Sequence, residues 1–153
     1  MPHKYEEVKL IFNNKTKAKD RPFAGSPEDA YSILRQAWDM QQINMVEESK
    51  LLLLDRKMRL MSICSLSKGG YSEVIVDARL IFAIAFKRRA DSIILSHNHP
   101  SGDVTPSRTD CVLTKNIHHI GQLLNMPLKD HLIISNEGYF SMNNKGFMEY
   151  NHG

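Results

Sequence analysis

The sequence predicts an α/β fold in which a mixed β-sheet carries helices on both faces. Short apolar segments alternate along the chain with segments whose apolar residues recur at helical spacing. One apolar segment, residues 51–54, consists of four leucines, which is typical of a strand covered on both faces. The chain then closes with two short apolar segments around a turn sequence, which favours a mixed sheet over an all-parallel one.

Length and composition indicate one globular domain of 153 residues. The 42% of hydrophobic residues exclude a disordered acidic tail, and every apolar run is far shorter than the roughly 20 residues that span a bilayer. We therefore expect no membrane partner. The first residues lack the apolar stretch of a secretory signal, so we expect a cytoplasmic protein. We expect residues 1–25 to be an N-terminal polar segment and residues 26–153 to be the folded domain.

The first helix is expected to begin after Ser26. Ser26 can cap the helix, Pro27 suits its first position, and Asp29 stands three residues after the cap. The apolar spacing of this helix fades near residues 41–42. The lysine-rich stretch before it is expected to be a connection, with one short strand at residues 8–12.

The next elements are expected to be two strands and a helix. Residues 47–55 form the central strand, and residues 59–66 follow after a polar turn. Alternation predicts that Leu60, Ser62, Cys64 and Leu66 share one face of this second strand. Asp77 can then cap a helix over residues 78–89. Its buried stripe is expected to consist of Leu80, Ile81, Ile84 and Ala85.

The last third of the chain is expected to be a strand, a helix and a hairpin. The strand covers residues 92–96. Thr105 is expected to cap the following helix, with a proline in its first position, and Pro127 to end it. Residues 132–134 and 139–141 are expected to pair as the two strands of the hairpin.

Two histidines and an aspartate indicate a metal site at the end of the third strand. His97 and His99 alternate along an extended segment, so their side chains point to the same side. Asp110 lies about one turn into the next helix and can converge on them. Two neutral imidazoles and a carboxylate form a catalytic zinc site with one open position, where water is acidified to a pKa near 7. The sequence therefore predicts Zn²⁺ as the cofactor.

A hydrolase of this kind also needs a group that accepts the proton of the attacking water. Glu47 and Glu48 both stand at the start of the central strand. Because side chains alternate along a strand, each glutamate shares a face with a different one of the strand's two apolar sets. The residues alone leave both glutamates open as this base.

The spacing of these residues resembles the JAMM signature of the JAB/MPN metalloproteases. In that signature an upstream glutamate is followed by two histidines separated by one residue, here His97 and His99. A serine follows after seven residues, here Ser107, and an aspartate after two more, here Asp110. The amino-acid sequence is more similar to the RadC-like branch of the family at residues 53–56, 59–60, 97–103, 105–110 and 130–133. The resemblance covers about residues 47–140.

The resemblance implies a JAB/MPN-like layered sandwich, similar to that of the cytidine deaminases, for the metal-binding domain. It implies zinc-dependent hydrolysis of amide bonds, either peptide or isopeptide, in a protein or peptide substrate. The implied zinc ligands are His97, His99 and Asp110. Ser107 is the implied catalytic serine that holds the oxygen of the tetrahedral intermediate, and Glu47 is the implied general base.

The sequence also differs from the usual residues of the family at several positions. Glu48 is the alternative base, because the register of the alignment can slip by one position. Ser49 stands where an aromatic residue is usual, and residues 77–79 differ from the usual His-Pro-Arg-Glu. Longer RadC proteins carry an N-terminal helical segment associated with DNA, and we expect the short stretch before the metal-binding domain to lack it.

Three other functions use part of the same pattern. Non-haem iron oxygenases bind iron through two histidines and a carboxylate, but more often on a β-barrel. Zinc deaminases need Pro-Cys-x-x-Cys, and the two cysteines, Cys64 and Cys111, are far apart. A RadC-like binding module without turnover would bind DNA or a protein through residues 15–19 and 87–89, which are basic. The net charge of +3 and the family's DNA-repair label permit such a partner without requiring it.

Overall fold

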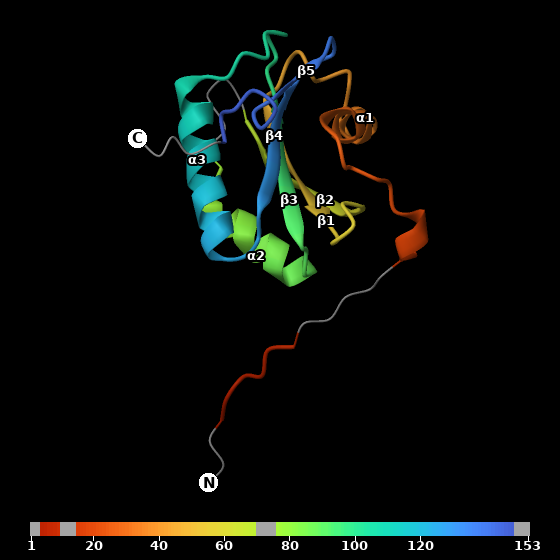
Figure 1. Cartoon of the computed structure of the whole chain (residues 1–153), viewed down its shortest axis with the longest axis vertical. Coiled ribbons are helices and arrows are strands. Elements are labelled where there is room, and N and C mark those ends of the chain that lie inside the picture. Colours follow the sequence, from red (N-terminus) through yellow and green to blue (C-terminus); the bar gives the residue numbers. More distant parts are fainter. Residues whose placement is uncertain (1–3, 10–14, 70–75, 149–153) are drawn as a thin grey trace.

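A mixed sheet lies at the centre of the molecule, between two layers of helices (Figure 1). The computed structural model describes residues 4–9, 15–69 and 76–148. Within them the strands are β1 (Glu48–Leu54), β2 (Leu60–Lys68), β3 (Ser92–Asn98), β4 (Leu128–Ile134) and β5 (Tyr139–Ser141). The helices are α1 (Pro27–Ala37), α2 (Ala78–Arg88), α3 (Arg108–Leu123) and the short 3₁₀ helix η1 (Ala18–Asp20).

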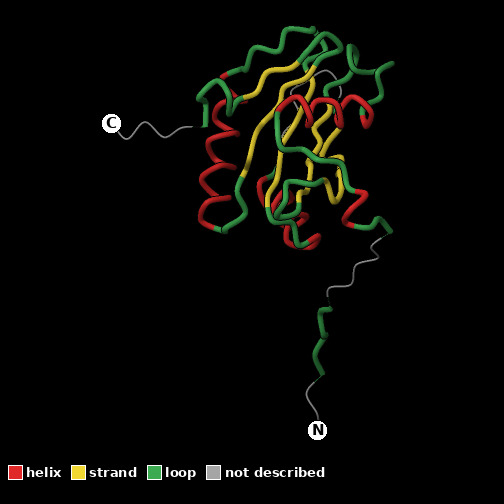
Figure 2. The backbone as a smooth tube through the Cα atoms, turned by 45° about the vertical axis from the view of Figure 1, so that its right-hand side comes forward, coloured by secondary structure: helices red, strands yellow, loops and turns green. Residues whose placement is uncertain are grey.

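The strand order β2-β1-β3-β4-β5 confirms the predicted mixed sheet. β1 pairs antiparallel with β2 and with β3, β3 pairs parallel with β4, and β4 and β5 form the predicted hairpin. Helix α1 covers one face, and α2 and α3 cover the other (Figures 1 and 2). The predicted α/β class with helices on both faces is therefore confirmed.

Strand β1 is buried on both sides, as its run of leucines predicts. Leu52 and Leu54 pack on the α1 side, together with Leu34 of that helix. Leu51 and Leu53 pack on the α2 and α3 side. Each face of the sheet therefore has its own apolar core, and burial of these side chains is the main force that holds the layers together.

Strand β2 contains an irregularity that the alternation rule does not predict. Leu53 lies opposite Ser62, but Leu54 lies opposite Leu60, so Met61 is an extra residue in the ladder. As a result Leu60 packs with the α1-side core. Cys64 and Leu66 pack on the opposite side, so the prediction that all of them share a face is wrong.

Helix α1 begins as predicted and ends earlier than predicted. The hydroxyl of Ser26 accepts a hydrogen bond from the backbone N–H of Asp29, and Pro27 is the first helical residue. The backbone becomes extended at Trp38, which is buried against the sheet. The carboxylate of Asp39 then accepts from the N–H of Gln41, which turns the chain away from the helix.

Helix α2 is capped by Asp77, as predicted, through the backbone N–H of Arg79. Its buried side chains include Ile81 and Ala85, but Leu80 is 44% exposed and Phe82 takes its place in the core. The predicted stripe is therefore rotated by part of a turn, because the helix packs on the sheet through Ile81, Phe82 and Ala85.

The N-terminal part of the chain joins the sheet at Phe23, which bridges to Arg59 beside the β1–β2 turn. Residues 4–9 form no strand. The remainder of the strand expected at residues 8–12 lies outside the described residues. Across the described part of the chain, every helix is too short or too polar to cross a membrane.

Candidate metal centre

The two histidines lie where β3 leaves the sheet. The strand continues to Asn98, two residues beyond the predicted end, so His97 is still within the ladder, opposite Ser49 of β1. The backbone N–H of His99 donates to the carbonyl of Ile134 in β4. Both rings point to the face of the sheet that α3 covers, as the alternation predicts.

Helix α3 delivers the carboxylate to this place through its first turn. The hydroxyl of Ser107 accepts from the N–H of Asp110 at 3.0 Å, and the carboxylate of Asp110 accepts from the N–H of Ser107 at 2.9 Å. This reciprocal capping box fixes the start of the helix at Arg108. The predicted cap at Thr105 is therefore wrong, because Ser107 has the partner three residues later that makes the stronger cap.

The donor atoms of the three predicted ligands are close together. Nε2 of His97 lies 3.0 Å from Nε2 of His99. Oδ1 of Asp110 lies 3.2 Å from the former nitrogen, and its Oδ2 lies 3.2 Å from the latter. A tetrahedral zinc ion with bonds of 2.0–2.1 Å separates its ligand atoms by about 3.3–3.4 Å. The residues therefore fit a zinc ion with little movement.

The hydrogen-bond partners of His99 determine which of its nitrogens is free. Its Nδ1 lies 2.7 Å from the carbonyl oxygen of Asp103, and a carbonyl can only accept. Nδ1 therefore carries the proton and donates it. In the neutral ring this leaves a lone pair on Nε2, the atom that faces His97 and Asp110.

The tautomer of His97 is determined by a longer chain of hydrogen bonds, which begins at Thr114. The hydroxyl of Thr114 donates to the carbonyl of Asp110 at 2.7 Å. The oxygen of this hydroxyl lies 2.6 Å from Nδ1 of His131 and must therefore accept the Nδ1 proton. Nε2 of His131 then accepts from Nδ1 of His97 at 2.7 Å. This again leaves the Nε2 lone pair of His97 facing the other ligands.

Burial keeps His131 neutral, as this chain requires. The ring is fully buried, and this burial lowers its pKa well below the usual value; the nearby His97 lowers it further. The chain joins the side chain of one ligand, His97, to the backbone of another, Asp110. Such outer partners orient metal ligands and fix their tautomers.

The two ring nitrogens and the two carboxylate oxygens thus face one another at about van der Waals distance, and a cation between them relieves their repulsion. Burial raises the pKa of Asp110, but the hydrogen bonds that His97 and His99 donate when their rings are protonated lower it more, so that it lies well below its usual range. The hydrogen bond to Asp110 raises the pKa of His99, although burial opposes this. Both shifts favour a positive charge beside the carboxylate of Asp110.

The two candidate glutamates point to opposite faces of the sheet. Glu48 turns away from the histidines, and its Oε1 lies 2.7 Å from Nζ of Lys50 and 3.3 Å from Oγ of Ser65. Glu47 lies on the metal side. A carboxylate oxygen of Glu47 and a ring nitrogen from each of the two histidines all lie within 4.8 Å of one another, so this group of three could also bind a metal.

Sequence reasoning did not single out two residues that organise the site, Thr114 and Asn98. Thr114 follows Asp110 by one helical turn and faces the sheet, which is a signal visible in the sequence. The bond of Asn98 to Ile43 and that of His131 to His97 each join residues more than 30 positions apart, so no local pattern indicates them.

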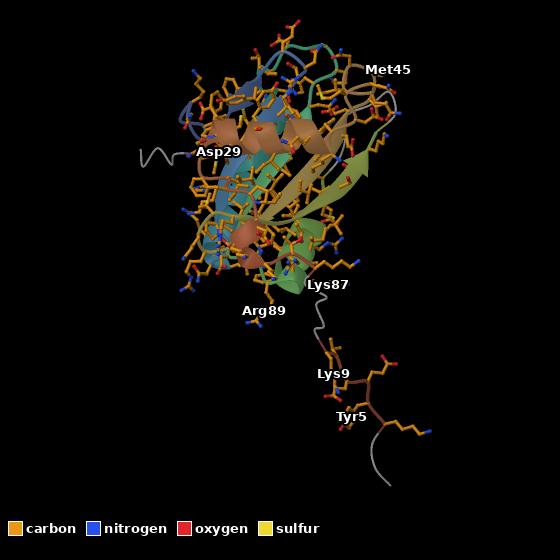
Figure 3. All side chains as sticks on the ribbon, turned by 90° about the vertical axis from the view of Figure 1, so that its right-hand side faces the viewer. Tyr5, Lys9, Asp29, Met45, Lys87 and Arg89 are labelled. Atoms are coloured by element: carbon orange, nitrogen blue, oxygen red, sulfur yellow. The ribbon has the colours of Figure 1, made fainter. Side chains whose placement is uncertain are left out.

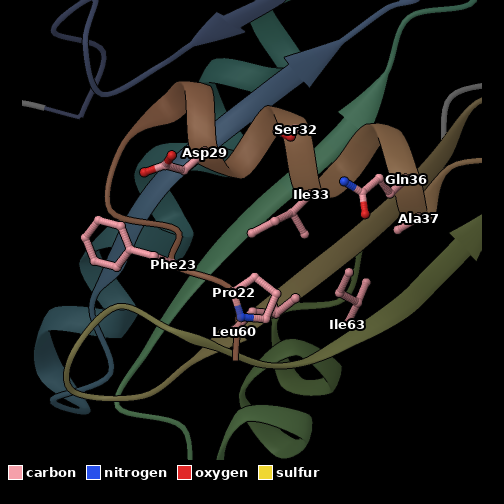
Figure 4. A pocket seen from close by; sticks show the side chains of 9 residues that line it. All are labelled: Pro22, Phe23, Asp29, Ser32, Ile33, Gln36, Ala37, Leu60 and Ile63. Carbon is pink, nitrogen blue, oxygen red and sulfur yellow. The ribbon is translucent and has the colours of Figure 1, made fainter. Parts of the chain in front are cut away.

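Two other features of the surface lie away from this centre. A hollow of about 500 Å³ lies between α1 and β2, on the opposite face of the sheet (Figure 4). Lys87 and Arg89 lie at one end of the domain and Met45, two residues before Glu47, lies at the other (Figure 3). Lys87 and Arg89 come before the start of β3 and the two histidines lie at its end, so β3 separates these cations from the histidines.

Comparison with known proteins identifies the family. Residues 24–147 match the RadC-like JAB domain. A UPF0758 protein of Caldanaerobacter subterraneus subsp. tengcongensis is 38% identical over 125 residues, which are 82% of this chain and 52% of that protein. A UPF0758 protein of Desulforamulus reducens is 35% identical over 131 residues, covering 86% of this chain and 56% of that protein.

A third relative, a UPF0758 protein of Porphyromonas gingivalis, is 45% identical over 103 residues, covering 67% of this chain and 45% of that protein. The chain thus spans about half the length of the curated relatives that it matches. The matched region includes the whole metal centre and the sheet that carries it. The chain belongs to the family of RadC-like JAB domains.

Proposed function

We propose that this protein is a zinc-dependent hydrolase that cleaves amide bonds, either peptide or isopeptide, in a protein or peptide substrate. The observation that carries the proposal is the set of ligand separations of 3.0, 3.2 and 3.2 Å among His97, His99 and Asp110. These are slightly shorter than the edges of about 3.3–3.4 Å of a zinc tetrahedron, and the two distances to Asp110 involve its two different oxygens. Three protein ligands leave the fourth position for solvent or substrate, which is characteristic of catalytic zinc rather than structural zinc.

The mechanism assigns proton transfer to Glu47. When bound, zinc supplies a Lewis acid that polarises a carbonyl and makes water acidic near neutral pH. Glu47 is near enough to the histidines to hydrogen-bond a water molecule between them. It accepts the proton of that water as the water attacks the scissile carbonyl, and then transfers the proton to the leaving amine. Glu48, paired with Lys50, is not placed for this role.

The hydroxyl of Ser107 is suited to stabilise the oxygen that becomes negative during the attack. Its lone pair accepts from the N–H of Asp110, so its own proton remains to be donated elsewhere. Because the capping box fixes the first turn of α3, the hydroxyl is held beside the ligand carboxylate before substrate binds. Preorganised donors of this kind are worth about 10²–10³ in turnover.

Cleavage of a peptide library tests the proposal. The zinc-loaded protein and its Glu47→Gln variant are incubated with peptides from a digested proteome, in water enriched in ¹⁸O. Mass spectrometry then counts new carboxyl termini that contain the label. We expect new labelled termini with the wild type. With Glu47→Gln we expect the rate of their formation to fall by about 10²–10⁴-fold, while the zinc content stays at one ion per chain.

Glu48→Gln is the matched control, because it changes the neighbouring carboxylate that pairs with Lys50. We expect it to retain activity. A dead Glu48→Gln beside an active Glu47→Gln would show that the assignment of the base is wrong by one position. If the zinc-loaded wild type releases no labelled termini from peptides or from isopeptide-linked peptides, amide hydrolysis is refuted, and a binding module becomes the better description.

A further inference from the structure

Asn98 stands between the two histidines, and its side chain points to the opposite face of the sheet. It is completely buried. Its Nδ2 donates to the carbonyl of Ile43 at 2.7 Å and to that of Val46 at 2.9 Å. Its Oδ1 accepts from the backbone N–H of Glu48 at 2.7 Å. Both protons of the amide, and its oxygen, are therefore bonded to the segment that enters β1.

These contacts surround one residue, Glu47. The carbonyl of Val46 immediately before it and the N–H of Glu48 immediately after it are both bonded to Asn98. The ladder between β1 and β3 begins only at the pair of Ser49 and His97. The side chain of Asn98 thus continues the connection between the strands past the last ladder pair, and fixes the backbone of Glu47 to the strand end that carries both histidines.

We propose that Asn98 is a positioning residue, which holds the carboxylate of Glu47 at its distance from the metal ligands. The inference rests on the proposed function of Glu47. At the end of β3, alternate side chains then have different roles on the two faces of the sheet. His97 and His99 bind the metal on one face, and Asn98 sets the place of the base from the other.

Neither Asn98→Asp nor Asn98→Ala reproduces this arrangement. Aspartate retains the acceptor for the N–H of Glu48 but has no protons for the two carbonyls. Alanine removes all three bonds. Both variants keep the histidines and Asp110. A positioning role of Asn98 therefore predicts that the carboxylate of Glu47 is displaced while metal binding stays intact. A merely structural role predicts a general loss of stability and of metal binding together.

The first test uses the metal-free protein and amide hydrogen exchange by NMR. We expect the N–H of Glu48 to exchange about tenfold faster, or more, in Asn98→Ala, because its acceptor is gone. It stays protected in Asn98→Asp. Asn44→Ala, an exposed residue of the same segment, is the matched control and should leave the exchange of Glu48 unchanged. Protection of Glu48 that persists in Asn98→Ala would overturn the inference.

The second test uses Co²⁺ as an optical probe of the metal site. The pH midpoint of the change in its visible absorption is compared in the wild type, Glu47→Gln, Asn98→Ala and the double variant. We expect Co²⁺ affinity to stay within about threefold of the wild type in all of them. We expect the midpoint of Asn98→Ala to move in the same direction as that of Glu47→Gln, and the double variant to move no further than Glu47→Gln alone.

The outcomes separate this inference from the proposed function. A midpoint that is unchanged in Asn98→Ala, or additive in the double variant, overturns the positioning role and leaves the hydrolase intact. A loss of Co²⁺ affinity of tenfold or more in Asn98→Ala shows that Asn98 supports the ligands instead, which also overturns it. A wild-type protein that binds no Co²⁺ overturns the proposed function and this inference together.

Discussion

The hydroxyl of Thr114 lies 2.6 Å from Nδ1 of His131, and both side chains are completely buried. Through this contact the backbone of one predicted metal ligand, Asp110, determines the tautomer of another, His97. Neither Thr114 nor His131 touches the position of the metal, yet both decide whether the nitrogen that faces it carries a proton. The metal centre therefore extends well beyond its three ligands.

Thr114→Val is expected to weaken zinc binding by about 10–100-fold, the usual cost of losing an outer partner. Valine has the shape of threonine but cannot accept the proton of His131, whose Nδ1–H is then buried without a partner. Competition with a chromophoric chelator measures the affinity. Thr114→Ser, which keeps the hydroxyl, should restore it. Thr109→Val, on an exposed position of the same helix, should have no effect; an equal loss there would contradict the explanation.

Asp110→Asn is expected to abolish stoichiometric zinc binding while the fold is retained. Asparagine keeps an oxygen for the N–H of Ser107, so the capping box loses little, but the negative charge between the two histidines is gone. Elemental analysis after gel filtration measures the metal content. Asp103→Asn is the control, because the carboxylate of Asp103 binds the N–H of Thr105. A full zinc complement in Asp110→Asn would exclude Asp110 as a ligand.

Zinc affinity is expected to fall with decreasing pH, beginning above pH 6.5. The hydrogen bond to Asp110 raises the pKa of His99 above its ordinary value of 6.5. A proton and zinc compete for the same nitrogen, so below this raised pKa each pH unit costs about tenfold in affinity for the one proton displaced. Above it the affinity levels off. Calorimetric titrations in buffers of different ionisation heat count the released protons, and an affinity independent of pH between about 5.5 and 8 would refute the competition.

Gly121→Ala is expected to destabilise the protein by about 1–3 kcal/mol. A Cβ at this position of α3 would lie 2.5 Å from the backbone carbonyl oxygen of Met126, which cannot move without shifting the turn into β4. Chemical denaturation measures the free energy of unfolding. Gly138→Ala is the matched control, because a Cβ there meets nothing within 4 Å. If the two variants unfold alike, the close approach of α3 to this turn is not a constraint.

The sequence predicts most of the fold because its strong signals are local. The leucines of β1, the cap at Ser26 and the cap at Asp77 are each determined by a few neighbouring residues. The start of α3 is predicted wrongly because Thr105 and Ser107 both satisfy the local rule. The reciprocal bond between Ser107 and Asp110 decides between them.

The remaining differences arise from contacts between distant segments. The extra residue in β2 that turns Leu60 to the other face depends on its pairing with β1. The contact of His97 with His131 depends on the parallel register of β3 and β4. Periodicity gives the alternation of side chains within a strand, but not the register between strands, so the ligands are predictable and the residues that orient them are not.

All three predicted ligands of the candidate metal centre come from one strand–helix junction, between His97 and Asp110, and the proposed base comes from another part of the chain. The capacity to bind metal and the capacity to turn over a substrate are therefore separable during evolution. Under the proposed roles, a descendant that altered the entrance to β1 would retain a bound ion and lose catalysis, whereas an insertion within residues 99–107 would remove the ion and catalysis together.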